Sequence, residues 1–148
     1  MPEVYRAPMR SRSDDVDLRA TLERARRSGV CGFGQRVGDG GEAARLGRRV
    51  ARFREIDDGS FVWTRDADGL YWLGRIDGPY FYDSDAAAAA VDLVHVRPCR
   101  WLPDPVLESQ APAAVIATFG RGGRNFQQTH DSAVGSQTAR IWSERMDR

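Results

Sequence analysis

The sequence predicts a single-domain α+β fold in which helices flank a curled, mixed or mostly antiparallel sheet of five or six strands. Three observations predict this fold. Three apolar segments between residues 61 and 101 alternate with turn sequences, as in a β-meander. Two segments with apolar residues at helical spacing precede the meander. The length of 148 residues suffices for one domain with its own core.

The N-terminal part predicts a leader and a helix. Residues 1–12 are polar and basic and carry two prolines, so we expect a flexible leader there and a single domain over residues 13–148. Ser13 precedes two aspartates, which favour a helix start because carboxylates are stabilised at the positive end of the helix dipole. Apolar residues then recur at helical spacing until Gly29, where we expect the helix to end.

A first strand and a second helix are expected before the meander. Residues 30–34 (VCGFG) form a short apolar run with glycines, which predicts a strand leading into a tight turn. Residues 42–54 predict a helix, because Leu46, Val50 and Phe53 make one apolar stripe with arginines on the opposite face.

The meander itself is predicted from three runs. Residues 61–63 (FVW) are followed by DADG at residues 66–69, a sequence typical of hairpin turns. Residues 70–76 then form the second strand. Residues 91–97 (VDLVHVR) alternate apolar and polar side chains, as expected for a third strand with one buried face. The alanine run 86–90 between them fits either one helical turn or an open loop.

The C-terminal third predicts two more helices and a closing strand. Residues 112–119 begin with proline and predict a short helix. Residues 120–124 (GRGGR) are expected to form a flexible basic loop, and residues 125–130 a closing strand. A last helix is expected from about residue 131 to about residue 146.

Composition narrows the function classes. The 22 basic and 21 acidic residues leave a net charge of +1, so any nucleic-acid binding must come from a local patch. All basic residues are arginine, which we interpret as codon bias rather than selection for phosphate contacts. Cys31 and Cys99 form no CxxC pair and have no histidine cluster beside them, so we expect no metal and no cofactor. Without a membrane-length apolar run or a signal peptide, we expect a cytoplasmic protein with no membrane contact.

No catalytic constellation emerges from the sequence. His95 alternates with two valines and is expected to be structural, and His130 and Asp131 are neighbours that rarely share a face of a strand. The acidic residues lie in turns and helix starts rather than in the clusters that a metal-dependent nuclease needs. We therefore expect a protein that is not an enzyme and has no catalytic residues.

Four short motifs follow one another in a recognisable order. They are DGSFVW at residues 58–63, WLGRI at residues 72–76, GPY at residues 78–80 with a later VRP exit, and PAAVIATFGRGGRNFQ at residues 112–127. Over about residues 29–130 the chain resembles the PUA-like superfamily, and within it the EVE and YTH-like domains associated with modification-dependent restriction. It departs from that pattern at Phe33, where such domains often carry tryptophan.

The resemblance implies a barrel-like sheet and a non-catalytic module that flips a methylated DNA base into an aromatic pocket. Stacking a base on an aromatic ring contributes roughly 1–3 kcal/mol, which offsets the cost of unstacking it from a duplex. The candidate base-pocket residues are Phe33, Trp63, Thr64, Trp72 and Gly74. The candidate contacts to the nucleic-acid backbone or base edges are Arg65, Arg75, Arg121, Arg124, Asn125 and Gln127. The competing interpretation makes the aromatics core residues and residues 120–124 a solvated surface loop.

Other functions stay open at this point. The module could bind RNA, as PUA-like domains do. It could also be an enzyme acting on a nucleotide or small metabolite, or a protein-interaction module whose aromatics are all core. If it reads modified DNA in restriction or phage defence, an effector nuclease would be supplied by a partner chain.

Overall fold

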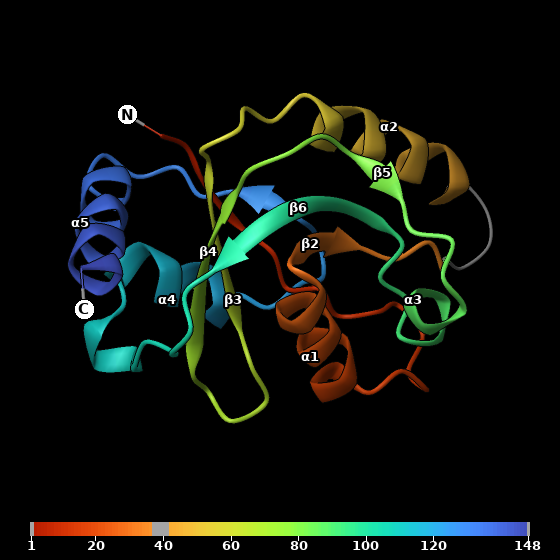
Figure 1. Ribbon diagram of the computed structural model, residues 1–148, viewed down its shortest axis with the longest axis horizontal. Helices are drawn as coiled ribbons and strands as arrows, with labels where there is room; N and C mark the ends of the chain where they lie inside the picture. The colour runs from red at the N-terminus through yellow and green to blue at the C-terminus, as the bar shows by residue number, and fades with distance from the viewer. Residues whose placement is uncertain (1, 37–41, 148) are drawn as a thin grey trace.

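The centre of the sheet is an antiparallel hairpin of strands β3 (Phe61–Arg65) and β4 (Tyr71–Ile76) (Figure 1). The side chain of Asp66 shapes the turn, because its Oδ1 accepts hydrogen bonds from the backbone nitrogens of Asp68 and Leu70 at 2.9 and 3.0 Å. Gly69 has a φ of 82°, a left-handed conformation that favours glycine. The predicted hairpin is confirmed in the computed structural model, which describes residues 2–36 and 42–147.

Seven strands form the sheet in the described part of the chain. Six follow the order β2–β6–β4–β3–β1–β7, and the two-residue β5 (Phe81–Tyr82) pairs with β6 outside that path. The bounds of the others are Val30–Phe33 for β2, His95–Trp101 for β6, Val4–Arg6 for β1 and Gln127–Gln128 for β7. Strand β1 runs parallel to β3, and every other pairing is antiparallel. The predicted α+β fold with a barrel-like, curled sheet is confirmed (Figure 1).

The expected flexible leader is wrong for most of its length, because β1 lies inside the sheet. Its register places Tyr5 opposite Val62 of β3 on one side and opposite Gln128 of β7 on the other. Ala7 and Met9 are buried just beyond it. The strand is only three residues long and its main partner is 57 positions further along the chain, so no local pattern marked it.

The third meander strand begins later than expected. Helix α3 (Ala86–Ala90) occupies the alanine run, and β6 starts at His95 rather than at Val91. Asp92 has a φ of 50° and interrupts the extended backbone. Its Oδ1 accepts hydrogen bonds from the backbone nitrogens of Gln35 and Arg36, so it ties the loop after β2 to the start of β6. Asp92, Leu93 and Val94 are all buried, so the alternation over residues 91–94 does not mark a strand with one exposed face.

The remaining helices follow the predicted pattern closely. They are α1 (Leu18–Ser28), α2 (Glu42–Arg54), α4 (Ala113–Gly120) and α5 (Val134–Met146), and a 3₁₀ turn, η1, lies at Glu108–Gln110. Helix α1 begins after the cap residue Asp17, whose carboxylate accepts a hydrogen bond from the backbone nitrogen of Arg19, and not at Ser13. The helix ends at Gly29 in a left-handed conformation, as expected.

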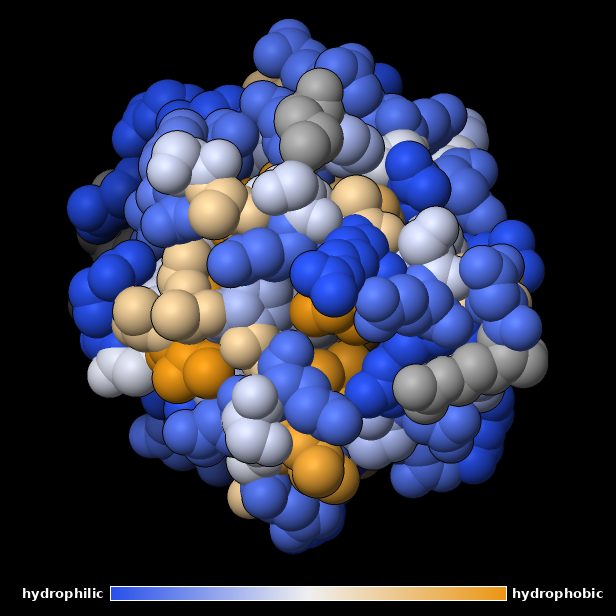
Figure 2. Space-filling model, turned by 90° about the vertical axis from the view of Figure 1, so that its left-hand side faces the viewer, coloured by the Kyte–Doolittle hydropathy of each residue, from blue (hydrophilic) through white to orange (hydrophobic). Residues whose placement is uncertain are grey.

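Two cores lie on opposite faces of the sheet. One packs α1, α2 and β2 against it, and the other packs α4 and α5 against β3 and β4 (Figure 1). Along β3, Val62 belongs to the first core, whereas Phe61 and Trp63 belong to the second. Figure 2 views the end of the molecule that α5 covers, where apolar side chains come to the surface between charged ones.

Helix α2 is fastened to the sheet by the guanidinium group of Arg97 on β6. Only 3% of this residue is exposed. Its Nη1 donates to the carbonyl oxygens of Phe53 and Ile56 at 3.0 and 2.6 Å, at the C-terminal end of α2. Its Nε donates to the Gly78 carbonyl oxygen at 2.8 Å, and its Nη2 pairs with Asp58 at 2.8 Å. A cation here is favoured because it meets the negative end of the helix dipole.

We expect Arg97→Ala to lower the free energy of unfolding by about 3–5 kcal/mol, because three carbonyl oxygens lose the hydrogen bond from a buried guanidinium and Asp58 loses its ion pair. Chemical denaturation followed by circular dichroism measures this change. The matched control is Arg100→Ala on the same strand, whose exposed side chain should change the stability by no more than about 0.5 kcal/mol. A loss below 1 kcal/mol for Arg97→Ala would contradict the fastening role.

Candidate functional site

The predicted pocket around Trp63 does not exist, because this indole belongs to the second core. Trp63 is fully buried, at 0% exposure, and its Nε1 donates to Thr138 Oγ1 of α5 at 3.2 Å. Thr64 is buried as well. A side chain at Gly74 would lie 2.6 Å from Cys99 Sγ and 2.7 Å from the Trp101 ring, so the space above this glycine is already filled. The three positions cannot border a ligand.

Trp72 and Arg75 are also engaged elsewhere. The guanidinium carbon of Arg26 lies 4.1 Å from the Trp72 ring centroid, and Trp72 Nε1 donates to Asp66 Oδ2 at 2.9 Å. The guanidinium of Arg75 lies 4.6 Å from the Phe61 ring, and its Nε donates to the Gly59 carbonyl oxygen. Neither side chain lines a hollow that the structure describes.

An aromatic hollow does occur, at the seam where the sheet fails to close into a barrel. We call it the aromatic pocket. It has a volume of about 360 Å³ and lies between β2, β1, β7 and helix α2. Its lining residues are Tyr5, Phe33, Arg49, Arg52, Phe53, Ile56, Asn125, Phe126, Gln127 and Gln128. The structure thus brings together Phe33, Asn125 and Gln127 from the residues singled out in the sequence.

Four aromatic rings make the apolar part of this pocket. The Phe126 ring is stacked on Tyr5, with centroids 5.6 Å apart and planes 28° apart. It meets Phe53 edge-on at 4.9 Å, and Phe53 in turn lies 5.1 Å from Phe33. Phe53 is buried on the inner face of α2, whereas the other three rings are only half-buried and can present surface to a ligand. Such a floor suits a flat, largely apolar molecule.

Hydrogen-bonding side chains rim the aromatic floor. Asn125 accepts a hydrogen bond at Oδ1 from Arg12 Nη2 at 2.7 Å, which leaves its amide nitrogen free to donate. Gln127 is exposed beside it and carries both a donor and an acceptor. Arg52 and Arg49 approach from α2. The rim therefore combines carboxamides, which suit the edge of a base, with guanidinium groups, which suit phosphate.

The Tyr5 hydroxyl stays protonated near neutral pH. It donates to Glu3 Oε1 at 2.8 Å, and Glu3 also accepts from Gln128 Nε2 through its other oxygen at 3.1 Å. Burial raises the pKa of Tyr5 above its usual range, and the hydrogen bond to Glu3 and the charge of that carboxylate add to the shift. Tyr5 therefore offers the pocket a neutral ring.

A small cleft of about 20 Å³ lies next to the aromatic pocket, and we call it the connecting cleft. It shares Phe33, Arg49 and Phe126 with the pocket. Arginines 10, 12, 36 and 124 continue along it. Two of these are loosely paired, Arg36 with Asp15 at 3.3 Å and Arg124 with Asp14 at 3.5 Å. Although the whole chain is nearly neutral, this side of the molecule is locally basic.

The other two predicted arginines differ in placement. Arg65 lines a further hollow together with Arg124, next to the loop of residues 120–124. Arg121 is exposed at the end of α4 and lines none of the described hollows. Burial lowers the pKa of Arg6, and the charge of Arg121 lowers it further, so these two guanidinium groups lie near each other.

Sequence reasoning missed Tyr5, Phe53 and Phe126 as pocket residues. Tyr5 was assigned to the leader, and Phe53 to the apolar stripe of its helix. A usable signal was present in NFQQ at residues 125–128, where an aromatic residue is surrounded by carboxamides. Arginines one and four residues before Phe53 are a second signal, because they put cations at the edge of the same helix face.

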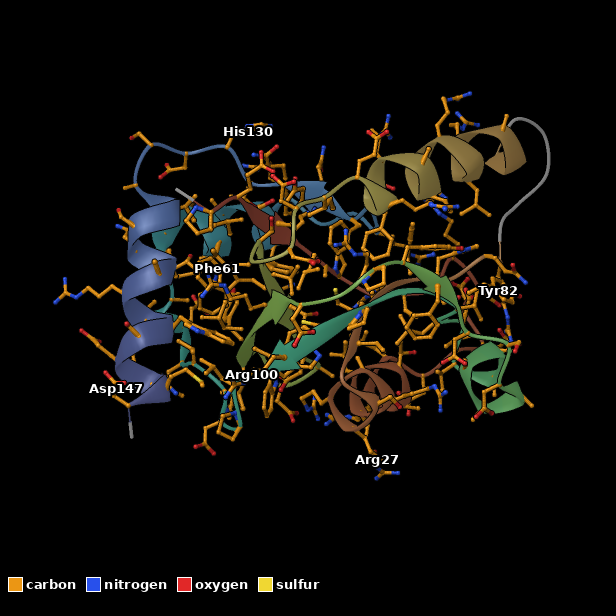
Figure 3. The ribbon with its side chains drawn as sticks, turned by 45° about the horizontal axis from the view of Figure 1, so that its top comes forward. Arg27, Phe61, Tyr82, Arg100, His130 and Asp147 are labelled. Atoms are coloured by element: carbon orange, nitrogen blue, oxygen red, sulfur yellow. The ribbon has the colours of Figure 1, made fainter. Side chains whose placement is uncertain are left out.

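His95 packs against Phe33, with ring centroids 5.7 Å apart, and its Nδ1 lies 2.8 Å from the Tyr80 hydroxyl. Its Nε2 is buried without a hydrogen-bond partner in the described residues. Burial lowers the pKa of His95, and Arg49 lowers it further, against an opposing effect of Asp92. The imidazole is thus neutral near pH 7. His130 lies on the loop before α5, well away from Tyr82 on β5 (Figure 3).

Other chemistry in the described ranges would need a metal site or a reactive thiol. No group of three or more His, Cys, Asp or Glu side chains is placed to hold a metal ion there. Cys31 and Cys99 are free and buried. Burial raises the pKa of the Cys99 thiol, and the hydrogen bond with Cys31 raises it further. None of the helices in these ranges is long and apolar enough to cross a membrane.

We expect the stability of the protein to fall as the pH drops below about 6.5, because of His95. The unfolded chain binds a proton there near pH 6.5, whereas the folded protein binds it only at lower pH, so acid favours the unfolded state. Denaturation midpoints at pH 7.0, 6.0 and 5.5 measure the effect. His95→Gln should flatten this fall and the exposed control His130→Gln should keep it; an unchanged fall in His95→Gln would refute the assignment.

Comparison with known proteins leaves the family open. No protein-family model matches the chain, and no curated protein matches it. Among solved structures it is similar to the crystal structure of protein Atu2648 from Agrobacterium tumefaciens, with a TM-score of 0.41 and 12% sequence identity. The alignment covers 94% of this chain and 92% of that one. At this level the likeness assigns neither a fold family nor a function.

Proposed function

We propose that this protein is a non-catalytic nucleic-acid-binding module that holds one unstacked base, a methylated DNA base foremost, in the aromatic pocket. One observation carries the proposal. Phe33 and Phe126 present ring surface in a hollow that is rimmed by Asn125, Gln127 and arginines of α2. The three kinds of group match the three parts of a nucleotide, namely its flat face, its polar edge and its phosphate.

The aromatic floor can offset the cost of taking a base out of a stack. Unstacking and unpairing cost a few kcal/mol, and each base–aromatic contact returns roughly 1–3 kcal/mol. The rings of Tyr5 and Phe53 support Phe126 from two sides, so little side-chain entropy remains to be lost when a ligand arrives. A pocket of about 360 Å³ is at the small end of ligand sites, which suits one base better than a stacked pair.

Selectivity for a modified base would be modest. A buried methyl group contributes roughly 0.8 kcal/mol, which corresponds to a preference of about fourfold. Asn125 and Gln127 add discrimination between base edges through donors and acceptors. We therefore expect the polar rim to choose the base and the apolar floor to favour its methylated form.

The resemblance to PUA-like, EVE and YTH-like domains is part of this proposal, as is a cytoplasmic location. The module would supply recognition, and an effector nuclease on a partner chain would supply cleavage in restriction or phage defence. RNA is the second ligand to test, because a base in an aromatic pocket can belong to either nucleic acid and only contacts to the 2′-hydroxyl tell the two apart.

We expect Phe126→Ala to weaken binding of a short oligonucleotide by about 5- to 150-fold, since one stacking contact is worth roughly 1–3 kcal/mol. Fluorescence anisotropy on DNA and RNA oligonucleotides carrying plain or methylated cytosine or adenine measures it. Trp72→Ala is the matched control, because it removes a half-buried aromatic ring outside the pocket and should keep wild-type affinity. A melting curve for each variant establishes that it is folded.

Two outcomes would count against the proposal. Wild-type protein that binds no oligonucleotide even at low salt would defeat nucleic-acid binding altogether. Folded Phe126→Ala protein that binds as wild type does would remove the base from the aromatic pocket. Equal affinity for plain and methylated bases would defeat the methyl preference alone.

A further inference from the structure

A second basic hollow lies beyond the connecting cleft, and we call it the arginine hollow. Its volume is about 390 Å³. The side chains of Arg10, Arg65 and Arg124 line it, together with the glycine pair at residues 122 and 123. Its one aromatic lining residue, Phe119, is buried and has the Arg65 guanidinium 5.7 Å from its ring. The arginine hollow therefore offers positive charge rather than a stacking surface.

The charges in the arginine hollow are available to a ligand. The side chains of Arg10 and Arg65 are exposed, and their guanidinium groups donate no hydrogen bond within the described part of the chain. The guanidinium group of Arg124 pairs only with Asp14, at 3.5 Å. Of the two lining carboxylates, Asp66 accepts hydrogen bonds from Trp72 Nε1 and from two backbone nitrogens. Glu108, the other, is exposed. Three arginines against two lining carboxylates leave an excess of positive charge, which favours an anionic ligand.

The wall beside these arginines is a fixed backbone surface. Gly122 and Gly123 have φ values of 74° and 95°, and Arg6 Nη1 donates to the carbonyl oxygens of Thr118 and Gly122 at 2.9 and 2.6 Å. A side chain at Gly123 would come within 2.6 Å of Arg6 Nη2. The loop thus stays free of side chains at this point, which lets a ligand backbone approach closely.

The arginine hollow and the aromatic pocket both border the connecting cleft, whose volume is only about 20 Å³. The connecting cleft shares Arg10 and Arg124 with the hollow, and Phe33, Arg49 and Phe126 with the pocket. The stacking site and the anion site are therefore neighbours, and a strand that passes over the cleft could reach both. A single strand of nucleic acid has this same sequence of parts, a base followed by charged backbone.

We propose that the arginine hollow binds the phosphodiester backbone of the strand that flanks the base in the aromatic pocket. The ligand is then a strand of at least two nucleotides and not a free base or mononucleotide. This inference rests on the proposed function and adds a second subsite to it. Arg10, Arg65 and Arg124 contact phosphate oxygens there, and they carry affinity without base preference.

The test compares ligands of one, two, three and five nucleotides with the same base, extended on either the 5′ or the 3′ side. Wild-type protein should bind more tightly as the strand lengthens and then reach a plateau. The double variant Arg10→Gln/Arg65→Gln should keep wild-type affinity for the mononucleotide and lose the gain with length. The slope of its log affinity against log salt concentration should be less negative by about 1.4, because two phosphate contacts on a single strand are removed.

The matched control is Arg27→Gln/Arg100→Gln, which removes the same charge from exposed positions outside the described hollows (Figure 3). It should behave as wild type. If the double variant keeps the full length dependence and salt slope, the hollow is not on the path of the strand. If it loses mononucleotide binding as well, the hollow is not a separate subsite. Wild-type protein that binds the mononucleotide but gains nothing with length overturns this inference alone, and protein that binds neither overturns the proposed function too.

Discussion

The buried guanidinium of Arg97 is the interaction on which the rest of this structure depends. From strand β6 it donates to the carbonyl oxygens of Phe53 and Ile56 at the end of α2 and to that of Gly78. Helix α2 contributes Arg49, Arg52 and Phe53 to the aromatic pocket, so the position of this helix decides whether the pocket exists. A buried cation of this kind is tolerated because each of its three guanidinium nitrogens donates a hydrogen bond to an oxygen.

A second arginine, Arg6, holds a helix end in the same way beside the arginine hollow. Arg6 is buried and donates to carbonyl oxygens at the end of α4, as Arg97 does for α2. Arginine therefore has two separate uses in this lysine-free chain. Buried arginines hold helix ends in place, and exposed arginines such as Arg10 and Arg65 make the surface locally basic. Net charge alone reveals neither use, since the two populations are balanced by carboxylates elsewhere.

Sequence reasoning worked where the determining pattern is local. The β3–β4 hairpin followed from DADG, and the bounds of α2 followed from a stripe of three apolar residues and a charged opposite face. It failed for Trp63, because alternation along a strand does not reveal that both faces of that strand are covered. It failed for β1 because three residues carry too little pattern and their partners are distant. Phe33, Asn125 and Gln127 were singled out individually, but only tertiary structure shows that they share a hollow.

The seam between β2 and β7 has a consequence for biosynthesis. Tyr5, Phe33 and Phe53 leave the ribosome long before Phe126, and β1 meets its edge partner β7 only when nearly the whole chain has been made. Such non-local pairing raises the contact order and slows folding. Until then the ring surfaces that Phe126 covers stay exposed on the nascent chain, and exposed apolar surface of this kind favours aggregation.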